Sequence, residues 1–127
     1  MESSKLVALL GAENVLDDPE ILAGYAADKS FAPARMPWAV AKPGSLEQVR
    51  ELVKFAADAR VPLIPVSSGS PRFRGDTVPA YGGIMVDMSG MNKIRMLDRK
   101  DRVAMIEPGV WFDELQEALR KEGLRLP

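Results

Sequence analysis

The sequence of 127 residues contains no cysteine and no histidine. These absences exclude disulfide bonds, thiolate and imidazole metal ligands, nucleophilic catalysis by either residue, and the usual general base near neutral pH. A long hydrophobic run is also missing near the N-terminus, where only residues 6–10 are consecutively apolar. This run is too short for the core of a signal peptide or for a membrane-spanning helix. The sequence therefore predicts a cytoplasmic protein with no membrane span and no metal site.

An excess of charge of either sign is absent as well, because 17 basic and 18 acidic side chains leave a formal net charge of −1. Such a balance creates no general attraction to nucleic acid or to an anionic membrane. A small nucleic-acid site at Arg72, Phe73 and Arg74 would need a basic stripe around it, which the sequence lacks. The composition, with 46% apolar and 28% charged residues, is typical of one soluble globular domain.

The pattern of turn-forming residues divides the chain into two parts. Residues 1–37 predict an N-terminal helical arm, with short helices beginning near Ser4 and Pro19, followed by an irregular, proline-containing segment. From residue 38 onward the pattern of apolar runs and turns becomes regular. We therefore interpret residues 38–127 as the main domain.

The first regular unit is a strand, a helix and a second strand. Residues 38–41 form a strand, and Ser45 and Gln48 form a capping-box pattern that begins a helix. Apolar residues then recur every three or four positions up to Arg60, which predicts one buried stripe. Residues 63–66 are a short apolar run typical of a strand buried on both faces, and the two strands should be parallel. The predicted stripe consists of Leu46, Val49, Leu52, Val53, Phe55 and Ala56.

The rest of the chain predicts three more strands and a helix. Residues 84–87 form a strand, and residues 94–97 and 103–106 flank a polar connection that suits a hairpin. A final helix then runs toward Gly123. The order β-α-β-β-β-β-α predicts an α+β fold, in which a βαβ unit is followed by antiparallel strands and a C-terminal helix, with a mixed sheet. The apolar side of the last helix is predicted to contain Trp111, Phe112, Leu115, Ala118 and Leu119.

Chemistry is indicated by residues 65–76, a segment of small residues that leaves the end of a predicted strand. Gly69 would let backbone N–H groups approach an anion closely, and Ser67, Ser68 and Ser70 add hydroxyl donors. The segment matches neither the P-loop pattern nor the G-x-G-x-x-G fingerprint of dinucleotide-binding folds. From these residues alone, a phosphate-binding loop and an ordinary surface loop remain open alternatives.

Several segments together form a family pattern between Trp38 and Pro127. They are Val40-x-x-Pro43-x-Ser45-x-Glu47-x-Val49, Val61-Pro62-Leu63-Ile64-Pro65 with Gly75 beyond it, Gly83-Ile84-Met85-Val86-Asp87-Met88, Met91-Asn92-Lys93-Ile94, and Ile106-Glu107-Pro108-Gly109-Val110 before Glu114-Leu115-Gln116 and Gly123-Leu124. In order and spacing they resemble the N-terminal part of the PCMH-type FAD-binding domain of the vanillyl-alcohol oxidase and p-cresol methylhydroxylase family. The pattern is most like the D-lactate dehydrogenase and glycolate oxidase D-subunit branch.

The resemblance implies that FAD is the cofactor, that residues 66–72 form its pyrophosphate loop, and that residues 107–109 run near the flavin. The loop has fewer glycines than is usual in the family, and Pro71 has no N–H to donate. Relatives tether the flavin through histidine or cysteine, so FAD is expected to bind noncovalently here. The implied cofactor-binding residues are Val66, Ser67, Ser68, Gly69, Ser70, Pro71, Arg72, Gly75, Glu107 and Gly109.

The implied function is an FAD-binding lobe of a flavin-dependent oxidoreductase that acts on a 2-hydroxy acid or a similar substrate. We expect residues 38–127 to be an incomplete first lobe, without the second FAD lobe and the cap domain in which the family's catalytic residues mostly lie. Catalysis by this chain alone is therefore not expected, and no catalytic residue is assigned. The alternative is a truncated, non-enzymatic nucleotide-binding or assembly module. Open sheet edges predict a covering partner, either the missing second lobe, a partner subunit or a second copy in a homodimer.

Overall fold

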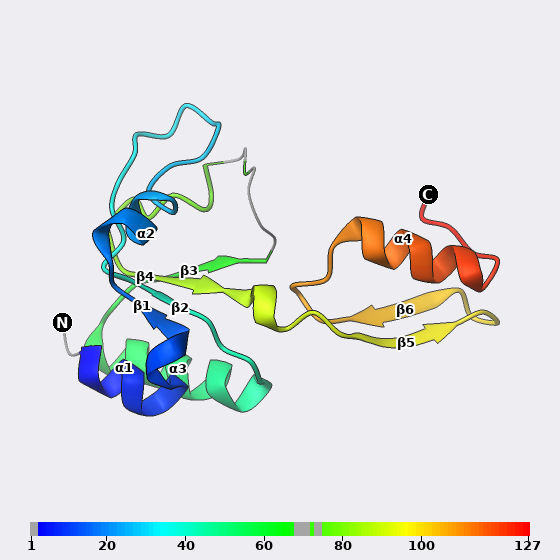
Figure 1. The fold of residues 1–127 in the computed structure, drawn as a ribbon, viewed down its shortest axis with the longest axis horizontal. Helices are drawn as coiled ribbons and strands as arrows, with labels where there is room; N and C mark the ends of the chain where they lie inside the picture. Colours follow the sequence, from blue (N-terminus) through cyan, green and yellow to red (C-terminus); the bar gives the residue numbers. More distant parts are fainter. Residues whose placement is uncertain (1–2, 68–71, 73–74) are drawn as a thin grey trace.

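A mixed sheet organises the first part of the chain in the computed structural model, which describes residues 3–67, 72 and 75–127 (Figure 1). Its strands are β1 (Val15–Leu16), β2 (Ala39–Ala41), β3 (Leu63–Val66) and β4 (Ile84–Asp87), in the order β1-β2-β4-β3. β4 is parallel to both of its neighbours, whereas β1 is antiparallel to β2. The predicted α+β fold with a mixed sheet is confirmed. The sequence analysis missed β1, because two residues are too few to show a period.

The βαβ unit is built around α3 (Leu46–Ala59), which joins β2 to β3. The Ser45 hydroxyl accepts a hydrogen bond from the Gln48 N–H at 3.2 Å, as the capping-box pattern predicts. The Gln48 side chain reaches back one residue further than in the usual capping box, because its oxygen accepts from the Gly44 N–H at 2.8 Å. The two joined strands are parallel, as predicted, but β4 lies between them.

β3 lies at the edge of the sheet, which corrects the prediction that this strand is buried on both faces. Val66 is buried, whereas Pro65 is exposed. Proline suits an edge strand, because it has no N–H to offer to a second neighbouring strand. The apolar run of residues 63–66 could not show that β3 is an edge strand, because this depends on the place of β4 in the sheet.

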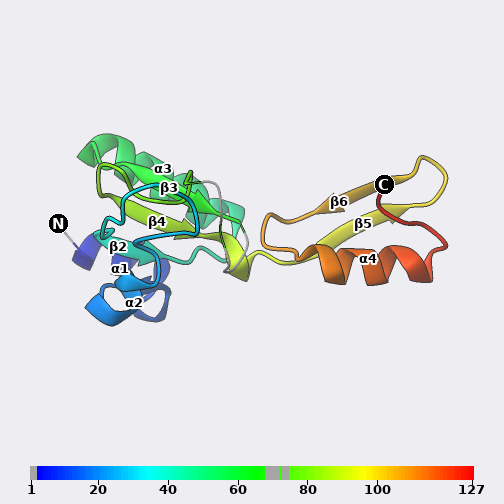
Figure 2. The same cartoon turned by 90° about the horizontal axis from the view of Figure 1, so that it is seen from above.

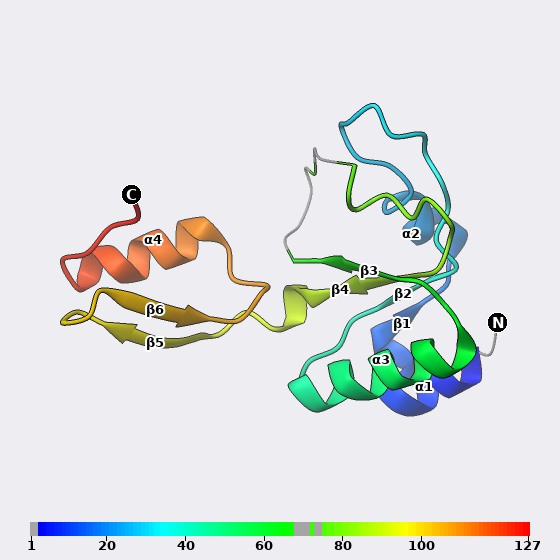
Figure 3. The same ribbon diagram turned by 180° about the vertical axis from the view of Figure 1, so that it is seen from behind.

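Helices cover both faces of the sheet (Figures 1 and 3). α1 (Ser3–Leu10), which the 3₁₀ turn η1 (Ala12–Asn14) connects to β1, lies with α3 on one face. α2 (Pro19–Ala23) lies on the other face. Successive strand residues point to opposite faces, so the core has two layers. The layer beneath α1 and α3 contains Leu6, Leu10, Val15, Ala39, Ala41, Leu52, Ile84 and Val86, and the layer beneath α2 contains Leu22, Val40, Val66 and Met85.

The buried stripe of α3 is narrower than the sequence predicted. Leu52 and Ala56 are buried and Phe55 packs against the same core. Leu46 and Val53, however, are 62% and 52% exposed, so the prediction was wrong for these two side chains. The helix rests on the sheet and on α1 along one side only, and a periodic pattern does not show how wide that contact is.

The second part of the chain is a hairpin packed against one helix, set apart from the first sheet (Figures 1 and 2). η2 (Met88–Gly90) leads from β4 into β5 (Ile94–Asp98) and β6 (Val103–Ile106), which pair antiparallel as predicted. α4 (Phe112–Lys121) lies along this hairpin. The buried residues between them are Val110, Leu115 and Leu119, with Ile94, Leu97, Ile106, Leu124 and Leu126 partly buried around them.

Two predicted core residues of α4 lie on its outside. Phe112 is 73% exposed and Trp111, which precedes the first helical residue, is 46% exposed. On the hairpin, Met96 and Met105 are paired across the strands and are exposed on the face away from α4. Since α4 covers one face of the hairpin, apolar residues on the opposite face remain in contact with solvent.

A stability prediction arises at the C-terminal end of α3. Arg60 ends this helix in the left-handed conformation, with φ 53° and ψ 42°. We expect Arg60→Gly to raise the free energy of unfolding by about 0.5–1 kcal/mol, because glycine adopts this conformation without a Cβ clash. Ala57→Gly, at an exposed position inside the helix, should lower it by about 1 kcal/mol. Urea unfolding followed by circular dichroism measures both changes, and an equal loss in both variants would contradict the expectation.

Candidate functional site

The carboxyl ends of β2, β4 and β3 meet at one edge of the sheet, because these strands are parallel. Lys42 follows β2, Asp87 ends β4 and Ser67 follows β3. Val66 and Asp87 are paired in register at this edge. Open sheets of parallel strands bind their ligands at the carboxyl ends of the strands. The predicted loop therefore leaves the sheet where a ligand site is expected.

The structure places the beginning of this loop clearly. Val66 is buried as the last residue of β3, and Ser67 is exposed directly after it. The predicted cofactor residues Ser68, Gly69, Ser70 and Pro71 lie outside the described residues. Their role stays a prediction from the sequence.

The far end of the loop is attached to the residues that follow α2. The Arg72 guanidinium donates a hydrogen bond to the Gly24 carbonyl at 2.9 Å. The same guanidinium lies over the Tyr25 ring, with its carbon 5.0 Å from the ring centre. The Lys29 N–H donates to the Arg72 carbonyl at 2.7 Å. Arg72 therefore contacts residues 24–29 through both its side chain and its backbone.

Gly75 is held by a carboxylate of the same segment. The Gly75 N–H donates to an oxygen of Asp28 at 2.5 Å, while the other oxygen accepts from the Ser30 N–H at 2.9 Å. Hydrogen bonds from Ser30 and from Gly75 hold the pKa of Asp28 below its usual value, and the charge of Arg72 lowers the pKa further. Asp28 is therefore an ionised acceptor at neutral pH.

Asp87 joins the carboxyl end of β4 to Tyr25. One carboxylate oxygen accepts from the Tyr25 hydroxyl at 2.6 Å and lies 3.9 Å from the Lys42 ammonium, and the other accepts from the Ser89 N–H at 2.9 Å. Burial raises the pKa of Asp87, but these hydrogen bonds and the Lys42 charge bring it below the usual value. Burial and the hydrogen bond to Asp87 raise the pKa of Tyr25 to about 12.

The sequence analysis missed Tyr25, Lys42 and Asp87. A usable signal exists for two of them, because Lys42 and Asp87 are charged residues at the ends of apolar strands that the analysis had recognised. Charged side chains at such positions meet at the carboxyl edge of a parallel sheet. Tyr25 has no comparable signal, since it belongs to a turn after α2 and reaches Asp87 only in the folded chain.

Glu107 and Gly109 lie where the hairpin joins the sheet. One Glu107 carboxylate oxygen accepts from the Lys93 N–H at 2.9 Å, and the other pairs with Arg95. The Lys93 hydrogen bond, and then Arg95, hold the pKa of Glu107 below its usual value. A Cβ on Gly109 would lie 2.3 Å from the carbonyl oxygen of Met88, the residue that follows β4. Gly109 is therefore close to the carboxyl edge, whereas the Glu107 carboxylate is turned toward its own hairpin.

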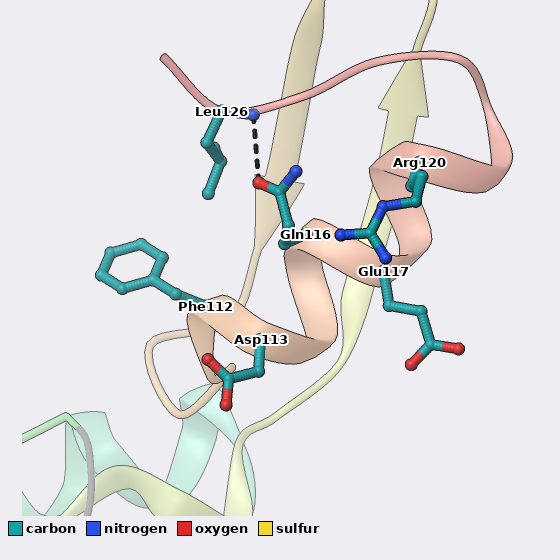
Figure 4. A pocket seen from close by; sticks show the side chains of 6 residues that line it. All are labelled: Phe112, Asp113, Gln116, Glu117, Arg120 and Leu126. Atoms are coloured by element: carbon teal, nitrogen blue, oxygen red, sulfur yellow. Dashed lines mark hydrogen bonds between the residues drawn. The ribbon is translucent and has the colours of Figure 1, made fainter.

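Two hollows are found among the described residues, and the smaller one includes the predicted cofactor residue Gly75 in its lining. A shallow one on α4, of about 590 Å³, is lined by side chains that include Phe112, Arg120 and Leu126 (Figure 4). A smaller one, of about 340 Å³, lies between residues 32–35 and residues 75–80. Within the described ranges there is no group of three or more potential metal ligands, and no helix is long and apolar enough to cross a membrane. Neither hollow contains a described group that identifies a ligand.

A pH prediction follows from Asp87. Because folding lowers its pKa, the ionised carboxylate stabilises the fold above the unfolded value of 3.8, and this contribution is lost as the pH falls through the lower folded value. We expect the wild type to be more stable than Asp87→Asn at about pH 6, and the difference to shrink toward about pH 2. Urea unfolding across this range measures it. If the difference in stability between the wild type and Asp87→Asn stays constant with pH, the lowered pKa of Asp87 is contradicted.

The parallel βαβ arrangement, with Ser67 leaving β3 at its carboxyl edge, is typical of a class of domains that bind nucleotides. Within this class, residues 37–127 match the family described as "FAD binding domain". The chain therefore belongs to the family of PCMH-type FAD-binding domains, and FAD is the family's cofactor. This confirms the resemblance found in the sequence.

Individual relatives agree with this family. The D-2-hydroxyglutarate dehydrogenase of Stutzerimonas stutzeri is 36% identical over 125 residues, which are 97% of this chain and 26% of that protein. The structure of p-cresol methylhydroxylase with substrate bound is 28% identical with a TM-score of 0.77, over 95% of this chain and 24% of that one. The 4-ethylphenol oxidase of Gulosibacter chungangensis is 29% identical with a TM-score of 0.82, over 94% and 24%. The chain thus spans about a quarter of the length of these relatives.

Proposed function

We propose that this chain forms the first lobe of a noncovalent FAD site in a flavin-dependent oxidoreductase that acts on 2-hydroxy acids. The observation that carries the proposal is the exit of the loop from β3 at the carboxyl edge of the parallel strands. The family match supports FAD as the ligand, and the likeness to a D-2-hydroxyglutarate dehydrogenase supports the substrate class. When bound, FAD would accept the hydride from the substrate.

The chemistry of the described residues fits a dinucleotide with a diphosphate. Lys42 places an ammonium group at the same edge, where its pairing with Asp87 is loose at 3.9 Å. The Thr77 hydroxyl is buried and has no hydrogen-bond partner among the described residues. Buried hydroxyls are usually satisfied, so a polar ligand beside the loop would account for this group.

The proposed roles follow the sequence analysis. Ser67, Ser68 and Ser70 would donate hydrogen bonds to the diphosphate, and Gly69 would let the backbone approach it. Val66 and Pro71 would bound this donor segment, and Arg72 and Gly75 would complete its far side. Gly109 would allow close approach of the flavin, with Glu107 beside it as a structural neighbour. Catalytic residues are proposed to lie outside this chain.

The test is a titration of the full chain with FAD, ADP and riboflavin, followed by calorimetry. We expect FAD and ADP to bind competitively with dissociation constants of about 10 μM to 1 mM, because one lobe encloses only part of the ligand. Riboflavin, which lacks phosphate, should not bind measurably, and Gly69→Val should abolish binding while Gly44→Ala leaves it unchanged. Absence of binding to FAD, ADP and pyrophosphate alike would overturn the proposal in favour of a non-enzymatic assembly module.

We also propose that a second protein surface covers the hairpin in a cytoplasmic assembly, either a second lobe, a partner subunit or another copy of this chain in a homodimer. The support is the exposure of Met96, Val103 and Met105, at 43%, 49% and 57%. Exposed apolar groups of this kind favour association. In this proposal residues 38–127 are the FAD lobe and residues 1–37 its arm. Light scattering after size exclusion tests the homodimer, and a stable monomer at micromolar concentration would exclude it.

A further inference from the structure

Residues 24–30 contact the far end of the loop at several points, although they lie before the stretch that matches the FAD-binding family. Arg72 is bound through its guanidinium to the Gly24 carbonyl and through its own carbonyl to the Lys29 N–H. Gly75 is bound through its N–H to the Asp28 carboxylate. The N-terminal arm therefore holds the chain on both sides of residues 73–74.

Tyr25 connects this attachment to the sheet. Its ring lies beneath the Arg72 guanidinium, and its hydroxyl donates to Asp87 at the carboxyl end of β4. Asp87 is itself held by the Ser89 N–H and is nearly buried, with 9% of its surface exposed. A continuous line of contacts thus runs from the end of β4, through Tyr25, to Arg72 at the far end of the loop. The near end of the loop begins one strand away, at Val66, which is paired with Asp87.

These contacts bear on the role of Arg72. Its guanidinium is already engaged by a carbonyl oxygen and by an aromatic face, and both contacts would have to be given up or shared if it turned toward a phosphate. A guanidinium that lies over an aromatic ring and donates to a carbonyl is well suited to fixing a backbone segment, because its geometry is rigid and its charge is always present. The geometry therefore favours attachment of the loop over direct contact with the anion.

We propose that Tyr25, Asp28 and Asp87 are positioning residues that hold the far end of the loop against the carboxyl edge of the sheet, with Arg72 as their point of attachment. The arm then fixes the positions of Arg72 and Gly75, at the far end of the loop, before the nucleotide arrives. Preorganisation raises affinity because less conformational entropy is lost on binding. The inference rests on the proposed FAD site for its effect on affinity, but the attachment itself is a property of the free protein.

The first experiment therefore uses the full chain without nucleotide and measures amide hydrogen exchange. Asp28→Ala should accelerate exchange of the Gly75 N–H by about tenfold or more, because this variant removes its acceptor. Tyr25→Leu should accelerate the Lys29 N–H in the same way, while the amides of β4 stay protected. Tyr81→Leu, at an 85% exposed tyrosine, is the matched control and should change neither amide. Unchanged exchange in Asp28→Ala and Tyr25→Leu would overturn the attachment, whether or not the chain binds FAD.

The second experiment measures ADP and FAD affinity in variants shown by circular dichroism to be folded. Tyr25→Leu should weaken both ligands by about tenfold, and Tyr25→Phe, which keeps the ring under Arg72, should recover much of that loss. Arg72→Lys should weaken binding as much as Arg72→Ala, because lysine keeps the charge but lacks the rigid guanidinium that binds the Gly24 carbonyl and lies over the Tyr25 ring. Arg120→Lys on α4 is the control for an arginine-to-lysine substitution away from the loop, and it should leave both affinities unchanged. If Arg72→Lys retains wild-type affinity and Tyr25→Leu has no effect, Arg72 is a direct phosphate ligand and the inference is overturned. If the wild type binds neither ligand, the proposed function fails, while the result of the hydrogen-exchange experiment stands on its own.

Discussion

Leu52→Ala is expected to lower the free energy of unfolding by about 3 kcal/mol. Leu52 is fully buried between α3 and the sheet, in the core layer that also contains Leu6 from α1 and Ile84 from β4. Removing most of its side chain would lose the transfer energy of the deleted carbons and leave a cavity that three elements cannot easily close.

The matched control is Val53→Ala, one position further along the same helix. Val53 is 52% exposed, so its replacement should change stability by no more than about 0.5 kcal/mol. Urea unfolding in a Trp111→Phe background leaves Trp38 as the fluorescent probe. Trp38 reports on the sheet, because it directly precedes β2 and its backbone N–H donates to the Gly83 carbonyl before β4. Comparable losses in both variants would mean that α3 is buried on the wider stripe that the sequence predicted.

Gly109→Ala is expected to lower stability by about 2–3 kcal/mol through overpacking at the junction of the two parts. A Cβ at this position would lie 2.3 Å from the Met88 carbonyl oxygen and 2.8 Å from that of Met91. Both are backbone atoms of the turn around η2, so neither can move aside as a side chain would. The Gly109 N–H also donates to the Met91 carbonyl at 2.8 Å, which fixes the distance between the two segments.

Gly90→Ala tests whether this effect is specific. A Cβ on Gly90 would lie 3.6 Å from the Pro43 carbonyl oxygen, an ordinary contact, so stability should change by about 0.5 kcal/mol or less. Thermal unfolding measured by circular dichroism compares the two variants. A Gly109→Ala variant as stable as the wild type, but weaker in FAD binding, would assign this glycine to the cofactor and not to packing.

Local signals in the sequence were sufficient for most of the secondary structure. Ser45 and Gln48 marked the start of α3, and a polar connection between two apolar runs marked the hairpin, because both patterns act within a few residues. The errors of the sequence analysis concerned which apolar side chains are buried. Leu46, Val53 and Phe112 have the spacing of core residues but face solvent, since burial depends on which element packs against which side of a helix.

The candidate site was predicted in part. The position of the loop after a buried strand end could be inferred, because a βαβ unit brings its strands together as parallel partners. The attachment of Arg72 to Gly24 and Tyr25 could not, since those residues are separated by more than forty positions and share no periodic pattern. The same applies to the hydrogen bond between Tyr25 and Asp87.

The amino-acid sequence by itself determined most of the elements of this protein and its membership of an FAD-binding family, and it predicts the segment that would meet the diphosphate. Each of these depends on the order and spacing of neighbouring residues. Only the tertiary structure decided that β4 lies between β2 and β3, that β3 is an edge strand, and that Tyr25, Asp28 and Asp87 hold the far end of the loop. Those outcomes depend on contacts between distant parts of the chain, which form only when the whole sheet and both of its faces pack together.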